Sequence, residues 1–128
     1  MSDPRSTQAR PLLDVGGLAR ALRDFAAERD WLQFHTPKNL AMALTGEVGE
    51  LVEVFQWMSP EQSAAAARDP ETAQAVRDEL ADVLVYLVRL ADVLGVDLDA
   101  AVRDKLARNA LRYPADQVRG SNRKYDKY

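Results

Sequence analysis

The chain has 128 residues, of which 47% are hydrophobic and 29% charged, a balance typical of one globular domain. It contains no cysteine, which excludes disulfides, thiolate metal sites and a cysteine nucleophile, and favours a cytoplasmic location. No apolar run reaches the roughly 18 residues that span a bilayer, and residues 1–10 lack the apolar core of a signal peptide. We therefore expect a soluble protein with no membrane partner.

Charge is distributed unevenly along the chain. Residues 1–100 hold 9 Lys and Arg against 17 Asp and Glu, whereas residues 101–128 hold 8 against 3. A solvated basic tail is one explanation of this asymmetry. The other is a ligand that carries both a metal ion and phosphates, because such a ligand needs carboxylates and cationic groups together.

Apolar residues recur at helical spacing through most of the chain, which predicts an all-α fold. Three sites pair an N-cap residue with a following proline, and a glycine and an aspartate separate the last two helices. These signals are Thr36-Pro37, Ser59-Pro60, Asp69-Pro70, Gly95 and Asp97. The expected helices cover residues 16–34, 37–58, a short stretch from 60, 70–94 and 98–113. We expect a flexible N-terminus over 1–15, one domain over 16–115 and a basic tail over 116–128.

Two pairs of carboxylates lie three residues apart on the second and fourth expected helices. Glu47 and Glu50 form one pair, and Glu79 and Asp82 form the other, so each pair projects from a single helix face. Glu47 falls within an apolar arc that contains no Lys or Arg. Because an isolated buried carboxylate costs several kcal/mol or more, this position predicts that a metal ion binds there.

An all-oxygen cluster suits the hard cation Mg²⁺, with Mn²⁺ as a substitute. The alternative is a solvated helix edge, since paired carboxylates are common on surface helices. A di-iron site requires Glu-x-x-His on two helices, and the single histidine, His35, lies outside both pairs. Gly46 and Gly49 each directly precede one carboxylate of the first pair, and each costs a helix about 1 kcal/mol relative to Ala. We expect a helix or a ligand to approach the backbone there, with simple tolerance of glycine as the alternative.

Aromatic residues surround the carboxylates in the sequence. Trp31, Phe34 and His35 cluster before the second helix, Trp57 follows Glu50 by seven residues, and Tyr86 follows Asp82 by four. Aromatic rings beside a metal site suggest a sandwich around a nucleotide base. A core position is the alternative for both tryptophans, and a capping role is the alternative for His35.

Polar residues suited to phosphate oxygens gather in the last helix and the tail. They are Lys105, Asn109, Arg112 and Lys124. The spacing of Lys105, Asn109 and Arg112 places these three on one helix face, although surface solvation is an alternative explanation for each residue singly.

Several motifs together resemble the dCTP pyrophosphatases, which are MazG-like all-α NTP pyrophosphatases. The resemblance covers roughly residues 18–125 and includes the signature Glu-x-x-Glu followed by Glu-x-x-Asp. The clearest stretches are Phe25-Ala-Ala-Glu-Arg-Asp-Trp31, Gly46-Glu-Val-Gly-Glu-Leu51, Asp78-Glu-Leu-Ala-Asp-Val-Leu84 and Arg112-Tyr-Pro-Ala115. One departure is Leu22, which stands where the vertebrate enzymes carry a pocket histidine and so affects the expected preference for cytosine.

The resemblance implies a MazG-like helical bundle with a four-helix core, assembled as a homodimer or homotetramer. It implies that Mg²⁺ is held by Glu47, Glu50, Glu79 and Asp82. As a mechanistic hypothesis, we expect Glu47 or Glu50 to activate the attacking water. The residues implied for the nucleotide are Trp31, Leu32, Gln33, Phe34, His35, Trp57, Tyr86, Lys105, Asn109, Arg112, Lys124 and Tyr125.

The implied activity is the conversion of dCTP, or of a related or modified dNTP, to the monophosphate and pyrophosphate in nucleotide-pool sanitation. The expected partner is this small-molecule substrate and not a nucleic acid. Two alternatives stay open at this point. One is a house-cleaning pyrophosphatase of broad specificity, and the other is a non-catalytic helical oligomer that binds nucleotides.

Overall fold

The computed structural model describes residues 10–121, which contain helices and no strand, as the all-α prediction requires. The elements in chain order are α1 (Gly16–Glu28), the 3₁₀ helix η2 (Leu32–Phe34), α2 (Pro37–Phe55), α3 (Pro60–Ala65), α4 (Ala73–Leu94), α5 (Leu98–Arg112) and α6 (Ala115–Val118). The chain divides into two compact units, one comprising Val15–Val96 and the other comprising Met1–Asp14 with Asp97–Tyr128. No helix of the described residues is long and apolar enough to cross a membrane.

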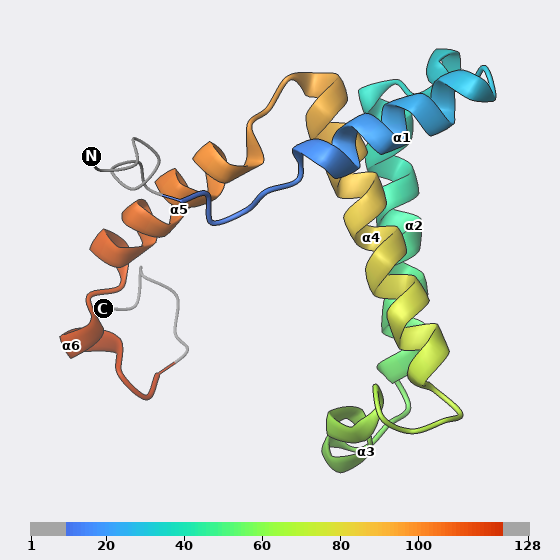
Figure 1. The fold of residues 1–128 in the computed structure, drawn as a ribbon. Helices are drawn as coiled ribbons and strands as arrows, with labels where there is room; N and C mark the ends of the chain where they lie inside the picture. The colour runs from blue at the N-terminus through green and yellow to red at the C-terminus, as the bar shows by residue number, and fades with distance from the viewer. Residues whose placement is uncertain (1–9, 122–128) are drawn as a thin grey trace, which may run out of the picture. The chain divides into compact units, whose positions relative to one another are not determined.

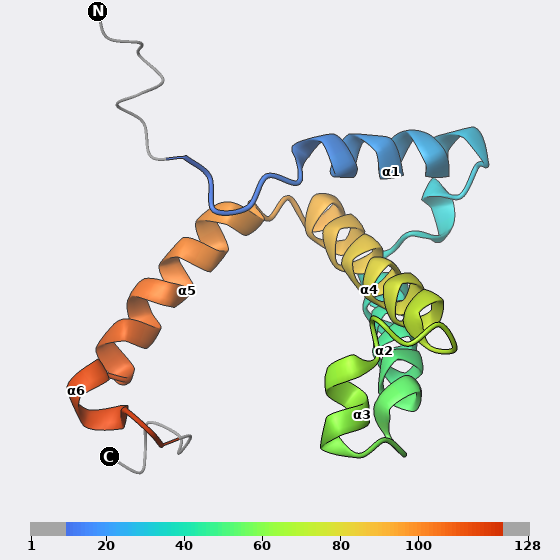
Figure 2. The same cartoon turned by 60° about the horizontal axis from the view of Figure 1, so that its bottom comes forward.

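In the unit formed by residues 15–96, α2 and α4 pack side by side along their length, and α1 packs against α4 (Figures 1 and 2). Leu40 of α2 and Val88 of α4 are the largest fully buried side chains. Leu40 belongs to the same apolar arc of its helix as Glu47. The pairing of α2 with α4 places the two carboxylate-bearing helices next to each other.

Capping interactions set most helix boundaries at the predicted residues. Thr36 accepts a hydrogen bond from the backbone N–H of Asn39, and Ser59 forms a reciprocal capping box with Gln62. Gly95 adopts the left-handed conformation, with φ of 68°, at the end of α4. These caps work locally because they satisfy backbone groups that a helix end leaves without intrahelical partners.

Three predicted boundaries are wrong. The first helix ends at Glu28, not at residue 34, because Asp30 takes a positive φ of 55° and the chain turns into η2. The fourth begins at Ala73, not at residue 70, because Asp69 uses its side chain to accept from the N–H of Glu71 in a turn. The second helix ends at Phe55, three residues before its expected end.

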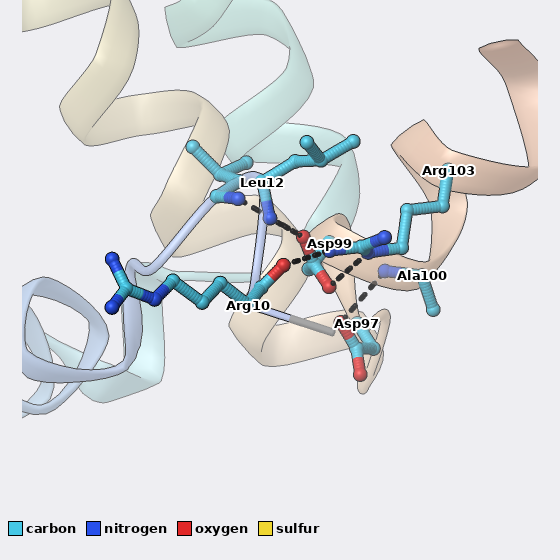
Figure 3. A network of polar contacts seen from close by, with 7 residues as sticks. Arg10, Leu12, Asp97, Asp99, Ala100 and Arg103 are labelled. Atoms are coloured by element: carbon cyan, nitrogen blue, oxygen red, sulfur yellow. Dashed lines mark hydrogen bonds and ion pairs between the residues drawn. The ribbon is translucent and has the colours of Figure 1, made fainter. Parts of the chain in front are cut away.

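In the other unit, Asp99 near the start of α5 anchors the N-terminal segment. Its Oδ1 accepts hydrogen bonds from the backbone N–H groups of Leu12 at 2.7 Å and Leu13 at 2.9 Å. Its Oδ2 accepts from Arg103, one turn later, at 3.0 Å, and Arg103 also donates to the carbonyl of Arg10. Figure 3 shows this network around Asp99 together with the N-cap Asp97, whose side chain accepts from the backbone N–H of Ala100. The basic stretch after Ala115, which has no clear period, begins with the short helix α6.

Candidate metal and nucleotide site

The packing of α2 against α4 brings three of the four predicted carboxylates together. Glu47, Glu50 and Glu79 each offer a carboxylate oxygen, and these oxygens all lie within 4.8 Å of one another. Glu47 and Glu50 reach the same place because residues three apart share a helix face. The tertiary fold adds Glu79, which no local spacing connects to the first pair.

Burial makes this cluster electrostatically unfavourable without a counter-charge. The Oε2 atoms of Glu47 and Glu79 are buried, and no group of the described chain hydrogen-bonds to them. Burial, followed by a hydrogen bond with Glu50 and the negative charges of Glu50, Asp82 and Glu79, raises the pKa of Glu47 to about 7. The pKa of Glu79 is also raised, by burial first and by the charge of Glu50 second.

The donor set fits a hard divalent cation. All three ligand atoms are carboxylate oxygens, the type that Mg²⁺ and Mn²⁺ prefer. Buried polar atoms without a partner are rare in folded proteins, and a cation between the three side chains would satisfy the two orphaned oxygens. The structure agrees with the predicted interior position of Glu47, because this residue is half-buried and forms no ion pair with a Lys or Arg of residues 10–121.

Asp82 lies beside this cluster and connects it to a pocket. Its charge contributes to the raised pKa of both Glu47 and Glu79, although it is not among the three whose oxygens lie within 4.8 Å. It lines an open pocket of about 350 Å³ between α1, the segment after it, and α4. The other lining residues are Leu22, Phe25, Ala26, Trp31, His35, Val85, Tyr86 and Arg89.

The pocket has an apolar, aromatic wall. The rings of Phe25 and Trp31 meet edge to face, with centroids 5.8 Å apart and planes at 67°. The guanidinium of Arg29 covers Phe25, its Cζ lying 3.6 Å from the ring centroid. The early end of α1 makes this arrangement possible, since the positive φ at Asp30 turns the chain before Trp31. Such a wall suits a flat heteroaromatic group.

The structure brings only some of the predicted aromatic residues into this pocket. Trp31, His35 and Tyr86 line it, whereas Leu32, Gln33 and Phe34 form η2 and are not among its lining residues. Trp57, just after α2, is 88% exposed, which rules out a core position within the described part of one chain. Leu22, the departure from the resembled enzymes, lies in the pocket itself.

Sequence reasoning missed Arg89, which is the buried charged residue of the pocket. It is 6% exposed, donates from Nε to Nδ1 of His35 at 3.0 Å, and pairs through Nη1 with Asp92 at 3.0 Å. Asp92 also forms an ion pair with Arg23, whose Nε lies 2.9 Å from its Oδ2. The sequence could have pointed to Arg89, because it lies seven residues after Asp82 and therefore on the same side of the helix.

Two further expectations have separate outcomes. A Cβ atom added at Gly46 or Gly49 would meet nothing within 4 Å in the described chain, so the expected close approach of a neighbouring helix of the same chain is wrong.

Lys105, Asn109 and Arg112 lie on α5 in the other unit, and their phosphate-binding role stays a prediction. Lys124 and Tyr125 lie outside the described residues.

Comparison with known proteins identifies a matching family and several similar proteins. The MazG-like family matches residues 43–127. The dCTP pyrophosphatase 1 of Rattus norvegicus is 48% identical over 122 residues, 95% of this chain and 71% of the rat protein. Its counterpart in Homo sapiens is 50% identical over 108 residues, 84% of this chain and 64% of the human protein.

A solved structure similar to this chain is also a pyrophosphatase. A pyrophosphatase from Archaeoglobus fulgidus superposes with a TM-score of 0.73 at 37% identity, covering 84% of this chain and 99% of that one. The described fold is all-helical, with paired carboxylates on α2 and α4, and the relatives place the chain among the nucleotide pyrophosphatases, a class of hydrolase. The chain belongs to the MazG-like family.

Proposed function

We propose that the chain is a nucleotide pyrophosphatase that hydrolyses dCTP, or a closely related dNTP, to the monophosphate and pyrophosphate. The names of the relatives, which are dCTP pyrophosphatases in rat and human, support the substrate. The pyrophosphatase from Archaeoglobus fulgidus supports the reaction class. The proposed biological role is sanitation of the nucleotide pool.

One observation carries the chemical part of this proposal. Two buried carboxylate oxygens, Oε2 of Glu47 and Oε2 of Glu79, have no hydrogen-bond partner in the described chain. They belong to a cluster with Glu50 that adjoins an aromatic pocket through Asp82. A bound nucleoside triphosphate would place its phosphates and their cation at the carboxylate cluster and its base in the aromatic pocket.

The proposed cation ligands are Glu47, Glu50, Glu79 and Asp82, and the proposed ion is Mg²⁺. When bound, the cation neutralises negative charge on the phosphates. Glu47 or Glu50 orients a water molecule and accepts its proton while the water oxygen bonds to the α-phosphorus. The bond between the α-phosphorus and the oxygen that bridges to the β-phosphate breaks, and pyrophosphate leaves with that oxygen.

Trp31 and Tyr86 hold the base from the aromatic side of the pocket, while Asp82 lies between the base and the carboxylate cluster. Stacking on an aromatic side chain contributes about 1–3 kcal/mol per base. It positions the base without reading its identity, so the preference among bases has to come from the polar groups of the pocket.

The proposed function is tested by incubating the protein and Mg²⁺ with a panel of NTPs and dNTPs, including dCTP, 5-methyl-dCTP and dUTP, and measuring monophosphate and pyrophosphate. We expect dCTP to be cleaved, and Glu50→Gln to abolish cleavage in a folded protein. Glu53→Gln, an exposed change on the same helix, is the matched control. Release of inorganic phosphate in place of pyrophosphate, or wild-type rates in Glu50→Gln, would contradict the proposed mechanism.

A further inference from the structure

A chain of four side chains, linked by one ion pair and two hydrogen bonds, ends in the pocket. Arg23 forms an ion pair with Asp92, with its Nε 2.9 Å from Oδ2. Asp92 accepts a hydrogen bond from Nη1 of Arg89 at 3.0 Å, and Arg89 donates from Nε to Nδ1 of His35 at 3.0 Å. The side chain of Arg89 is 8% exposed, so its guanidinium is held in one place by Asp92 on one side and His35 on the other. Both Arg89 and His35 line the pocket.

This contact determines which nitrogen of His35 carries a proton. Arginine is always a donor and never an acceptor, so Nδ1 of His35 must be unprotonated to accept from it. Burial and then the charge of Arg89 lower the pKa of His35, and a neutral imidazole keeps one N–H. That hydrogen is therefore on Nε2, and within residues 10–121 the imidazole makes no other side-chain hydrogen bond.

We propose that Arg89 is a specificity-determining positioning residue that fixes His35 as the Nε2–H tautomer, so that the pocket selects a pyrimidine with a hydrogen-bond acceptor at ring nitrogen N3. This inference rests on the proposed function, because it concerns the base of the proposed nucleotide substrate. His35 is the group that contacts the base, and Arg89 acts through it.

The chemistry of the pyrimidines explains the direction of the selection. Cytosine presents two neighbouring acceptors, O2 and N3, whereas uracil and thymine carry a hydrogen on N3. A fixed N–H donor pairs with the cytosine acceptors and faces a second donor in uracil. A donor that a bound base covers and leaves without a partner is costly. The positive guanidinium beside His35 strengthens the preference for an acceptor-rich edge.

His35 is the single histidine of the chain, so NMR reads its tautomer without ambiguity. Long-range ¹H–¹⁵N spectra of the full-length protein at neutral pH should show an unprotonated Nδ1 and a protonated Nε2. Arg89→Met should change this signature toward a mixture of tautomers, Arg89→Lys should restore it, and Arg77→Met on the exposed side of α4 should leave it unchanged. A protonated Nδ1 in the wild type would overturn the proposal, even if Arg89→Met did not fold.

Steady-state kinetics with dCTP and dUTP test the consequence for substrate choice. Arg89→Met should lower the ratio of kcat/KM for dCTP over dUTP by roughly tenfold, mainly through KM for dCTP, with Arg89→Lys closer to the wild type and Arg77→Met equal to it. An unchanged ratio in a folded Arg89→Met would overturn the inference while leaving dCTP cleavage intact. If the wild type cleaved no nucleotide, the proposed function would fail and this selection with it, whatever tautomer the NMR spectra showed.

Discussion

Glu47 on α2 and Glu79 on α4 each bury a carboxylate oxygen that no group of the described chain hydrogen-bonds. The two side chains face the same small volume together with Glu50, and both carboxyl pKa values are raised. Without a bound cation, the ionised carboxylates of such a site repel one another and destabilise the folded state. A bound cation removes this repulsion and stabilises the folded state. Function and stability are therefore linked at this cluster.

Removing one charge from the cluster should stabilise the protein without metal and weaken its response to metal. Glu47→Gln relieves repulsion and the burial of a charge, so its thermal midpoint in chelator should rise by several degrees. The increase in midpoint that Mg²⁺ produces in the wild type should shrink or vanish. Differential scanning fluorimetry with chelator and with Mg²⁺ measures both effects, and Glu53→Gln is the control that should behave as the wild type.

The metal-free protein should lose stability as the pH rises from about 5 to about 8. The pKa of Glu47 is about 7 in the folded state against 4.5 for an ordinary glutamate, so the folded state binds the proton more tightly. Its contribution is complete below pH 4.5 and is lost as the pH passes through about 7. Urea unfolding in chelator across this range measures the trend, and Glu47→Gln should flatten it. A slope that is the same in both proteins would contradict the assignment.

Trp31 should contribute to substrate binding more than to the chemical step. It lines the pocket beside Phe25, and loss of one stacking ring costs about 1–3 kcal/mol. Trp31→Leu should therefore raise KM for dCTP roughly tenfold or more with a smaller change in kcat. An effect confined to kcat would place Trp31 outside the base site.

The chain should form a homo-oligomer through apolar residues of α2 and α4 that one chain leaves exposed. Val52 and Leu80 are each 54% exposed and Leu84 is 43% exposed, more apolar surface than a solitary helix pair normally presents. Leu84→Glu should reduce the mass in sedimentation equilibrium to that of one chain, whereas Leu111→Glu, a change at an exposed position of α5, should leave the assembly intact. A wild type that sediments as one chain at all concentrations would refute this prediction.

Asp99 should hold the N-terminal segment to α5. Its pKa is lowered chiefly by the hydrogen bond from the backbone of Leu13 and further by Arg103 and the backbone of Leu12. Asp99→Ala should therefore remove the protection of the Leu12 and Leu13 amides in hydrogen exchange. Asp104→Ala, which breaks only an exposed ion pair with Arg108, should leave both amides protected.

The sequence determined the features that depend on near neighbours in the chain. The caps at Thr36, Ser59 and Asp97 and the stop at Gly95 follow from hydrogen bonds and backbone conformations that span a few residues. The pairing of Glu47 with Glu50 follows from the helical repeat alone. The predicted first helix is too long, because the spacing of apolar residues does not reveal the positive φ of Asp30 that ends the helix.

Only the tertiary structure decided what comes together across long separations. The packing of α2 on α4 adds Glu79 to Glu47 and Glu50 and buries two of their oxygens. The packing of α1 on α4 forms the open pocket that Trp31 lines. The contact of Arg89 with His35 joins residues 54 apart in the chain. No local pattern encodes such a contact, because it depends on which buried faces meet and on where a charged side chain finds its partners once water is excluded.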